Sequence, residues 1–135
     1  MLIGAGSESG AAKAENAYDR ATTALPKNAL VFNNRGSFRQ SKGDVNGAVD
    51  DFTKAIELDS RYAAAYAGCS SAYGQMYQLI AREDRYRELA QELSFKALMY
   101  DNNLSEAYRA MGLSYFLWGR LSQATASCTK AIEID

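Results

Sequence analysis

Two stretches of the sequence, "TKAIELD" at 53–59 and "TKAIEID" at 129–135, are identical except for Leu58 against Ile134. Their first residues lie 76 positions apart. A third stretch of the same kind, "FKALMYD" at 95–101, begins 42 positions after the first and 34 positions before the last. We therefore expect three related units, of which the middle one carries eight extra residues.

The residues before these stretches indicate that each unit is a pair of helices. "VFNNRGSFRQSKGDVNGAVDDFTKAIELD" at 31–59 and "AYRAMGLSYFLWGRLSQATASCTKAIEID" at 107–135 align without a gap. In the later unit, apolar residues recur at helical spacing on both sides of Gly119. They are Ala107, Tyr108, Met111, Tyr115 and Leu117 before the glycine, and Leu121, Ala124, Cys128, Ala131 and Ile132 after it. Glycine favours helix ends, and helices joined by a short turn pack antiparallel, so the pattern predicts an all-α fold.

A 34-residue helix–turn–helix unit resembles the tetratricopeptide repeat, which places W-x2-L-G-x2-Y on its first helix and A-x3-F-x2-A on its second. The matching residues are Phe32, Gly36, Ala48, Phe52 and Ala55 in the first unit, Tyr66, Tyr73, Ala90 and Ala97 in the second, and Tyr108, Met111, Gly112, Tyr115, Ala124 and Ala131 in the third. Arg35 and Arg39 stand where Leu and Tyr are usual, and Ser94 and Cys128 replace the aromatic residue of the second helix. The resemblance covers residues 29–135 and implies an α-solenoid with a right-handed superhelical stack.

The same pattern divides the chain, as a single domain, into four segments. The units are residues 29–62, 63–104 and 105–135. Residues 1–28 form a tail followed by either a partial unit or a capping helix, because Ala17, Ala21 and Ala24 have second-helix spacing. Since the third unit stops where a further helix would begin, we expect the chain to be a fragment of a larger protein.

The extra residues of the middle unit fall between Tyr73 and Ala90. Good helix formers fill this stretch, so we expect each of its two helices to be longer by about one turn. Asp84 is the expected start of the second helix, because a carboxylate is favoured near the positive helix end. Tyr77 and Ile80 are expected to continue the buried stripe, and the charged tip is either a solvated surface or a docking point.

Composition excludes several classes of function. The net charge of −1 lacks the basic excess of a nucleic-acid-binding surface, and no apolar run is long enough to span a membrane. The sequence has no histidine and two cysteines, so we expect no metal or other cofactor, buried thiols at Cys69 and Cys128, and a reducing, cytoplasmic location. Neighbouring acidic residues such as Asp50 and Asp51 do not face each other on a helix, and "GAGSESG" lacks the Lys-Ser/Thr of a phosphate-binding loop. We therefore expect a protein that is not an enzyme.

The resemblance implies a concave groove, lined by the first helix of each unit, that binds a peptide or a helix of a partner protein. The positions beside the buried stripe of those helices are Asn33, Ser37, Gln40, Ala67, Ser71, Gly74, Gln78, Arg109, Leu113 and Phe116. The charged clamp with which some family members hold an acidic C-terminus is not matched. Its positions read Asn33 with Ser37, then Gly68, then Glu106 with Ala110.

Two other functions remain open. The first helix of the third unit ends in four apolar residues, Leu113, Phe116, Leu117 and Trp118. They predict a covering helix, a ligand-binding patch or homo-oligomerisation through this end. "AYAGCSSAYGQMYQL" at 65–79 resembles repeat arrays attached to bacterial cyclases and kinases, which implies a regulatory module of a signalling enzyme. The leading hypothesis is a non-catalytic interaction scaffold with a protein or peptide partner.

Overall fold

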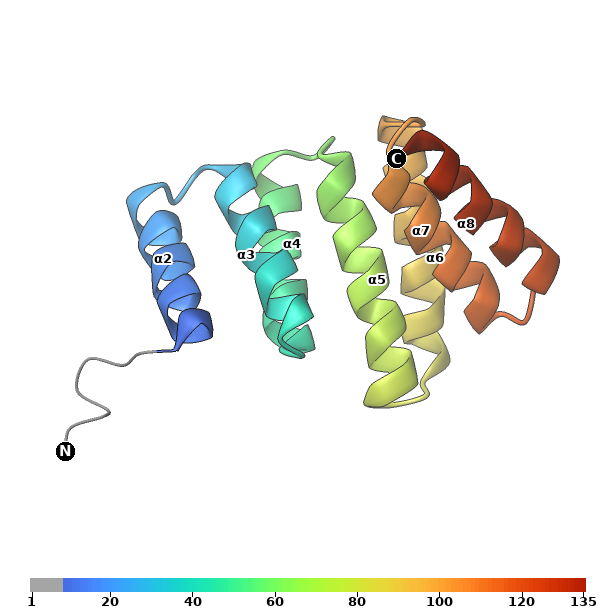
Figure 1. Ribbon diagram of the computed structural model, residues 1–135, viewed down its shortest axis with the longest axis horizontal. Helices are drawn as coiled ribbons and strands as arrows, with labels where there is room; N and C mark the ends of the chain where they lie inside the picture. The colour runs from blue at the N-terminus through green and yellow to red at the C-terminus, as the bar shows by residue number, and fades with distance from the viewer. Residues whose placement is uncertain (1–8) are drawn as a thin grey trace.

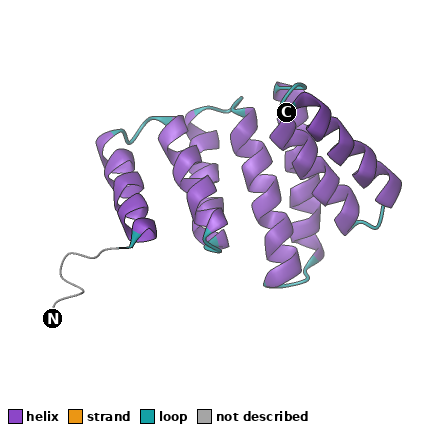
Figure 2. Ribbon diagram, in the orientation of Figure 1, coloured by secondary structure: helices purple, strands orange, loops and turns teal. Residues whose placement is uncertain are grey.

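A computed structural model of the protein describes residues 9–135. The described residues form seven helices and no strand, and Figures 1 and 2 show the helices standing side by side along the molecule. The start of the expected tail, at residues 1–8, lies outside the described residues. The helices are α2 (Gly10–Ala24), α3 (Ala29–Ser41), α4 (Val45–Leu58), α5 (Ala63–Leu79), α6 (Asp84–Tyr100), α7 (Ser105–Leu117) and α8 (Leu121–Ile134).

Three helical hairpins, α3–α4, α5–α6 and α7–α8, make up the body of the molecule (Figure 1). Each hairpin packs against the next: α5 contacts α4, and α7 contacts both α5 and α6. α2 packs against α3 in front of the first hairpin, where the rings of Tyr18 and Phe38 lie 4.9 Å apart. The expected all-α helical repeat fold is confirmed.

The turns of the first and third hairpins have the same construction. Gly43 and Gly119 adopt positive φ angles of 85° and 75°, in the left-handed region that favours glycine. The N–H group that follows each glycine then reaches back into the first helix, from Asp44 to the Arg39 carbonyl and from Arg120 to the Tyr115 carbonyl, both at 2.9 Å. The two glycines therefore set the antiparallel return of the chain.

The middle hairpin is the longer one, as its sequence predicted. α5 and α6 have 17 residues each, against 13 in α3 and α7 and 14 in α4 and α8. Asp84 is the first residue of α6, although the capping position before it makes no side-chain hydrogen bond. The expectation for Ile80 is wrong, because α5 ends at Leu79 and both side chains are exposed at the tip of the hairpin.

The core of the first two units is built around the ring of Phe52, which is 1% exposed. A Cβ atom on Gly36 or on Gly68 would lie 2.9 Å or 2.5 Å from the Cε1 atom of this ring. α3 and α5 can therefore hold the ring between them only because both positions lack a side chain.

The third unit differs from the sequence prediction on the outer side of α8. Ala124 and Ala131 are buried as expected, and Ser127 joins them. Leu121, Cys128 and Ile132, which were expected in the buried stripe, are exposed because no helix packs on that side of α8 in the described chain. Cys69 is buried as expected, and both cysteines are free thiols.

The two arginines that depart from the repeat pattern connect three helices. Arg35 of α3 donates from Nε and Nη2 to the two carboxylate oxygens of Asp51 in α4, both at 2.9 Å. Its Nη1 atom also donates to Asp19 Oδ1 at 3.0 Å and to Thr22 Oγ1 at 2.9 Å, both in α2. Arg39 donates to Asp51 at 3.1 Å. The hydrogen bond with Asp51, opposed by burial, raises the pKa of Arg35. Because their partners lie on neighbouring helices, the two arginines help to hold α2 and α4 against α3.

Candidate functional site

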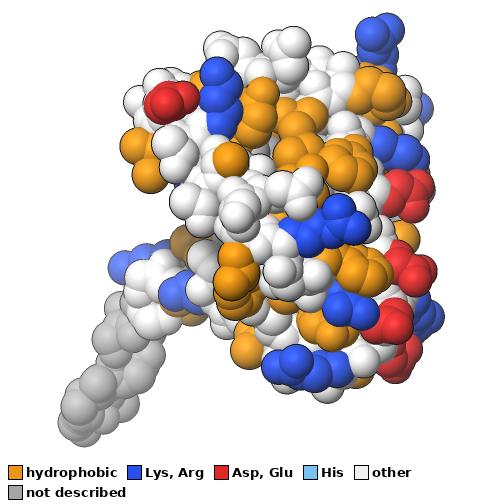
Figure 3. Space-filling model, turned by 90° about the vertical axis from the view of Figure 1, so that its right-hand side faces the viewer, with side chains coloured by type: hydrophobic (Ala, Val, Ile, Leu, Met, Phe, Trp, Pro, Cys, Tyr) orange, Lys and Arg blue, Asp and Glu red, His pale blue; other side chains and the backbone are white. Residues whose placement is uncertain are grey.

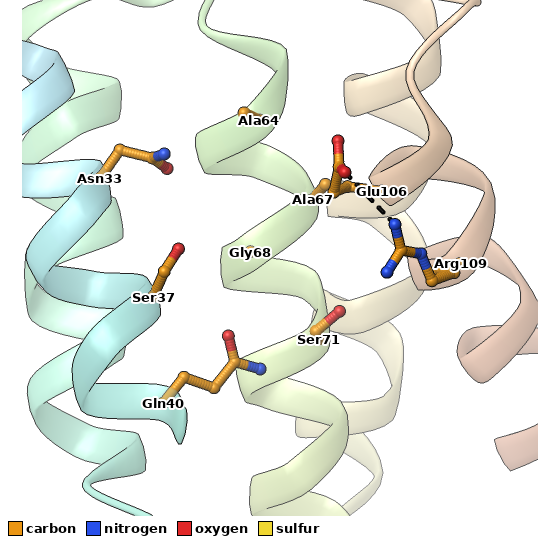
Figure 4. A pocket seen from close by; sticks show the side chains of 9 residues that line it. All are labelled: Asn33, Ser37, Gln40, Ala64, Ala67, Gly68, Ser71, Glu106 and Arg109. Carbon is orange, nitrogen blue, oxygen red and sulfur yellow. Dashed lines mark hydrogen bonds and ion pairs between the residues drawn. The ribbon is translucent and has the colours of Figure 1, made fainter. Parts of the chain in front are cut away.

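A cavity of about 430 Å³ opens on the face formed by the first helices α3, α5 and α7 (Figure 4). Three consecutive hairpins contribute to it, so the site exists only because the units stack side by side. Its lining residues are Asn33, Ser37, Gln40, Ala64, Ala67, Gly68, Ser71, Glu106 and Arg109.

The α3 wall of the cavity carries uncharged polar groups. Asn33, Ser37 and Gln40 follow at spacings of four and three residues, which places them on one face of the helix. Burial raises the pKa of the Tyr62 phenol, and a hydrogen bond with the Asn33 side chain acts in the opposite direction. Within the described chain, the Oδ1 atom of Asn33 is buried without a hydrogen-bond partner.

The floor of the cavity, formed by α5, carries only small side chains. Ala64, Ala67, Gly68 and Ser71 present nothing larger than a hydroxymethyl group along two turns of the helix (Figure 4). Gly68 has to remain a glycine because the ring of Phe52 lies directly beneath it. Core packing on one side of α5 therefore keeps the floor of the cavity open on the other side.

The α7 side of the cavity carries an internally balanced charge pair. The Nη2 atom of Arg109 lies 3.3 Å from Glu106 Oε1 and 3.2 Å from Ser105 Oγ (Figure 4). Both charged side chains are more than half exposed, so water screens this pair strongly. Since the two charges cancel, the lining residues carry no net charge.

Six of the ten residues that the sequence indicated line this cavity: Asn33, Ser37, Gln40, Ala67, Ser71 and Arg109. The other four lie elsewhere. Gly74 is buried, because a Cβ atom there would lie 2.8 Å from Leu113 Cδ2, and Gln78 is exposed beyond the cavity. Leu113 and Phe116 line a second cavity between α7 and α8, which shares Arg109 with the first cavity.

Sequence reasoning missed three lining residues, Ala64, Gly68 and Glu106. Ala64, Gly68 and Ser71 repeat the four-and-three spacing of Asn33, Ser37 and Gln40, and this repetition was the available signal. Glu106 lies three residues before Arg109, a spacing at which opposite charges pair on a helix.

The residues that the structure describes contain neither a metal-binding cluster nor a membrane-spanning helix. No cluster of three or more Cys, Asp or Glu side chains is arranged there to hold a metal ion. None of the helices described combines the length and the apolar character that crossing a bilayer requires.

The sequence model of the tetratricopeptide repeat matches residues 29–62 and 102–135, which together are half of the chain. The chain belongs to the tetratricopeptide repeat family. The two matched segments correspond to the tetratricopeptide repeat (TPR) units without the insertion.

Human tetratricopeptide repeat protein 36 is 33% identical to this TPR chain over 70 residues. The match covers 52% of the chain and 37% of the human protein, so the chain spans little more than a third of that relative's length.

Several solved TPR structures share the fold. TTC0263 of Thermus thermophilus superposes with a TM-score of 0.82 at 23% identity, over 90% of this chain and 64% of that one. YrrB, described as a TPR protein with an unusual peptide-binding site, gives a TM-score of 0.68 at 21% identity over 90% of this chain and 58% of its own. The first TPR of Spaghetti (RPAP3), bound to the HSP90 peptide SRMEEVD, gives 0.65 at 20% identity over 79% of both chains.

Proposed function

We propose that this TPR chain is a non-catalytic protein-interaction module whose cavity on α3, α5 and α7 holds a peptide segment of a partner protein. The observation that carries the proposal is a continuous cavity on three first helices, lined by amides, hydroxyls and small side chains. Amide and hydroxyl groups can pair with the backbone of a bound chain, whereas the small residues of α5 let that backbone approach closely. The peptide-bound structure of RPAP3 and the peptide-binding site named for YrrB support this use of the fold.

The charge of the cavity favours an uncharged peptide segment. Arg109 is the one basic residue among the lining residues, and Glu106 already neutralises it. An acidic peptide would meet no unpaired cation in this cavity, and a basic peptide would meet no unpaired carboxylate. We therefore propose a partner segment of small and neutral polar residues, whose backbone is bound by the side chains of Asn33 and Gln40.

A peptide array probed with the purified chain tests this proposal. The array should contain neutral, acidic and basic peptides of equal length, and the expected outcome is preferential binding to the neutral set. Ser37→Glu on α3 and Ser71→Glu on α5 should each weaken binding of a selected peptide by at least about tenfold, because each places a carboxylate in the cavity. Ser37 is exposed and Ser71 is half-buried, so neither change enters the core.

Ser122→Glu is the matched control, because Ser122 is exposed on α8 and lies outside the cavity. Its affinity for the selected peptide should equal that of the unchanged chain. Equal affinity of all three variants, or preferential binding of acidic peptides that survives Ser37→Glu and Ser71→Glu, would exclude the proposed site.

A further inference from the structure

The outer side of α8 presents a stripe of residues with the spacing of a helix–helix contact. Leu121, Thr125, Cys128 and Ile132 follow at intervals of four, three and four residues, and all four are exposed. Leu121 is 62% exposed and Ile132 is 76% exposed. Alternating intervals of four and three residues keep one side of a helix turned toward a partner helix. The end of the molecule that carries α8 faces the reader in Figure 3, where hydrophobic side chains lie among uncharged ones with some Lys and Arg side chains between them.

The first TPR unit shows what the same positions do when a helix covers them. Val45 and Phe52 of α4 align with Leu121 and Cys128 of α8, and they are 5% and 1% exposed beneath α5. The side of α8 that faces outward is therefore the side that this fold buries elsewhere.

A cavity of about 580 Å³ runs along this side of α8. Leu113 and Phe116 of α7 form its other wall, and Cys128 lies at its centre against Gly112. Phe116 is itself more than half exposed, so the apolar surface extends from α8 onto α7. The stripe and the cavity together form one surface, which we call the end face.

We propose that the end face is an interface between two copies of this chain, in which α8 packs antiparallel against α8 of the second copy around a twofold axis at Cys128. The groove between α7 and α8 then receives the apolar stripe of the other copy. This interface shares Arg109 with the peptide cavity but uses none of the small residues of α5 that floor it, so the inference does not depend on the proposed peptide-binding function.

Charge complementarity favours a second copy in this orientation. Arg120 precedes α8 and Asp135 follows it, so an antiparallel pair brings each arginine near the aspartate of the other copy. Neither residue forms an ion pair within the described chain. Ser122 and Thr129, which lie beside the stripe, are uncharged. Arg109 of α7 also lines the cavity, where its charge is balanced by Glu106 of its own chain, and exposed Glu133 follows Ile132.

Stacking the start of one copy on the end of another is less favourable. α2 exposes Lys13, Glu15 and Arg20, and covering the apolar end face with it would remove charged groups from water without partners. A twofold pair instead places apolar surface on apolar surface on both sides of the axis.

The two cysteines allow the location of the interface to be tested by oxidation. Cys128 is exposed on the end face, whereas Cys69 is 3% exposed and burial raises the pKa of its thiol to about 12. Diamide accepts two electrons and two protons from a pair of thiols, which leaves one S–S bond. A disulfide-linked dimer that forms in the unchanged chain and in Cys69→Ala, but not in Cys128→Ser, is the expected result.

A relocated cysteine separates antiparallel from parallel pairing. In the proposed pair, Leu121 of one copy lies opposite Asp135 of the other, so the two copies of residue 121 are about 21 Å apart along the helix. A disulfide needs Cα atoms within about 7 Å, so Leu121→Cys in a Cys128→Ser background should not form a linked dimer. Linkage of this variant as efficient as that of Cys128 would overturn the proposed orientation.

Sedimentation equilibrium from micromolar to millimolar concentration measures the association itself. The expected result is a monomer–dimer equilibrium, weakened at least about tenfold by Ile132→Glu because this change would bury an unpaired carboxylate. Leu79→Glu is the matched control, since Leu79 is 74% exposed but lies at the tip of the α5–α6 hairpin, and it should leave the equilibrium unchanged. A monomer throughout this range would overturn the proposal.

Discussion

The guanidinium carbon of Arg87 lies 3.9 Å from the centre of the Trp118 ring. Arg87 comes from the first turn of α6 and Trp118 from the end of α7, so the contact joins the lengthened hairpin to the third unit. The same guanidinium donates from Nη1 to the carbonyl of Leu117 at 3.2 Å, and from Nη2 to Asp84 at 2.7 Å. The additional turn of α6 thus supplies a cation that covers the last turn of α7, where a helix presents carbonyl groups without helical partners.

Replacing Arg87 by alanine should destabilise the fold by about 1–3 kcal/mol, because it removes a stacked cation and a hydrogen bond to a helix end. Urea unfolding measures this change. Trp118 is the only tryptophan in the sequence, so its fluorescence in the folded state should also shift to longer wavelength as water reaches the ring. Arg85→Ala is the control, because the Arg85 side chain is 67% exposed and water screens its ion pair, so this change should destabilise the fold less than Arg87→Ala does. Equal effects of the two changes would contradict this function of Arg87.

Removing the carboxylate of Asp51 should be more damaging than removing that of Asp19, although Arg35 contacts both. The Asp51 side chain is buried and receives three hydrogen bonds from the two arginines, whereas that of Asp19 is about half exposed. Asp51→Ala leaves partly buried arginines without their carboxylate and should cost about 3–5 kcal/mol, whereas Asp19→Ala should cost about 1 kcal/mol. Thermal unfolding of the two variants checks this order, and the reverse order would contradict it.

Alkaline conditions should destabilise the protein through Cys69. The folded-state pKa of this thiol is about 12, raised by burial from an ordinary value of 9.0. Between these two values the unfolded chain releases the thiol proton while the folded chain retains it. The stabilisation is complete below pH 9 and decreases by at most about 1.4 kcal/mol per pH unit as the pH rises toward 12. Urea unfolding across this range measures the slope.

Cys69→Ala supplies the comparison for the pH experiment. Its stability should decrease less steeply above pH 9, because one of the groups that lose a proton on unfolding is absent. Some alkaline dependence should remain, since burial also raises the pKa values of Tyr66 and Tyr73. Identical slopes for the variant and the unchanged chain would show that Cys69 does not contribute.

Gly68→Ala should destabilise the fold by about 1–3 kcal/mol, because its Cβ atom would lie 2.5 Å from the Phe52 ring. Gly10→Ala is the control, since nothing lies within 4 Å of a Cβ atom at that position. Thermal unfolding measures both changes. In the double variant Gly68→Ala with Phe52→Leu, the smaller side chain should relieve the overlap, so the combined loss should be less than the sum of the two separate losses. Strict additivity would count against a direct clash.

The sequence predicted the repeat, the helix pairs and the longer middle hairpin, because local periodicity and turn glycines determine these features. It did not predict the interactions of Arg35, since their partners Asp19 and Asp51 lie 16 residues away on either side and belong to other helices. For the same reason it did not show that Leu113 and Phe116 line the cavity between α7 and α8. Helical spacing specifies which residues share a face, but the rotation of α7 against its neighbours decides where that face points.

The contact between Gly68 and Phe52 also limits how this TPR chain can diverge. A side chain added at position 68, on the floor of the cavity, would require a smaller residue at position 52. A substitution of Gly68 alone is therefore unfavourable. The walls on α3 and α7 are free of this constraint, because Ser37 and Arg109 are exposed. Related proteins, and engineered versions of this one, should therefore acquire new ligand preferences by substitutions on those two helices while Gly68 of α5 remains unchanged.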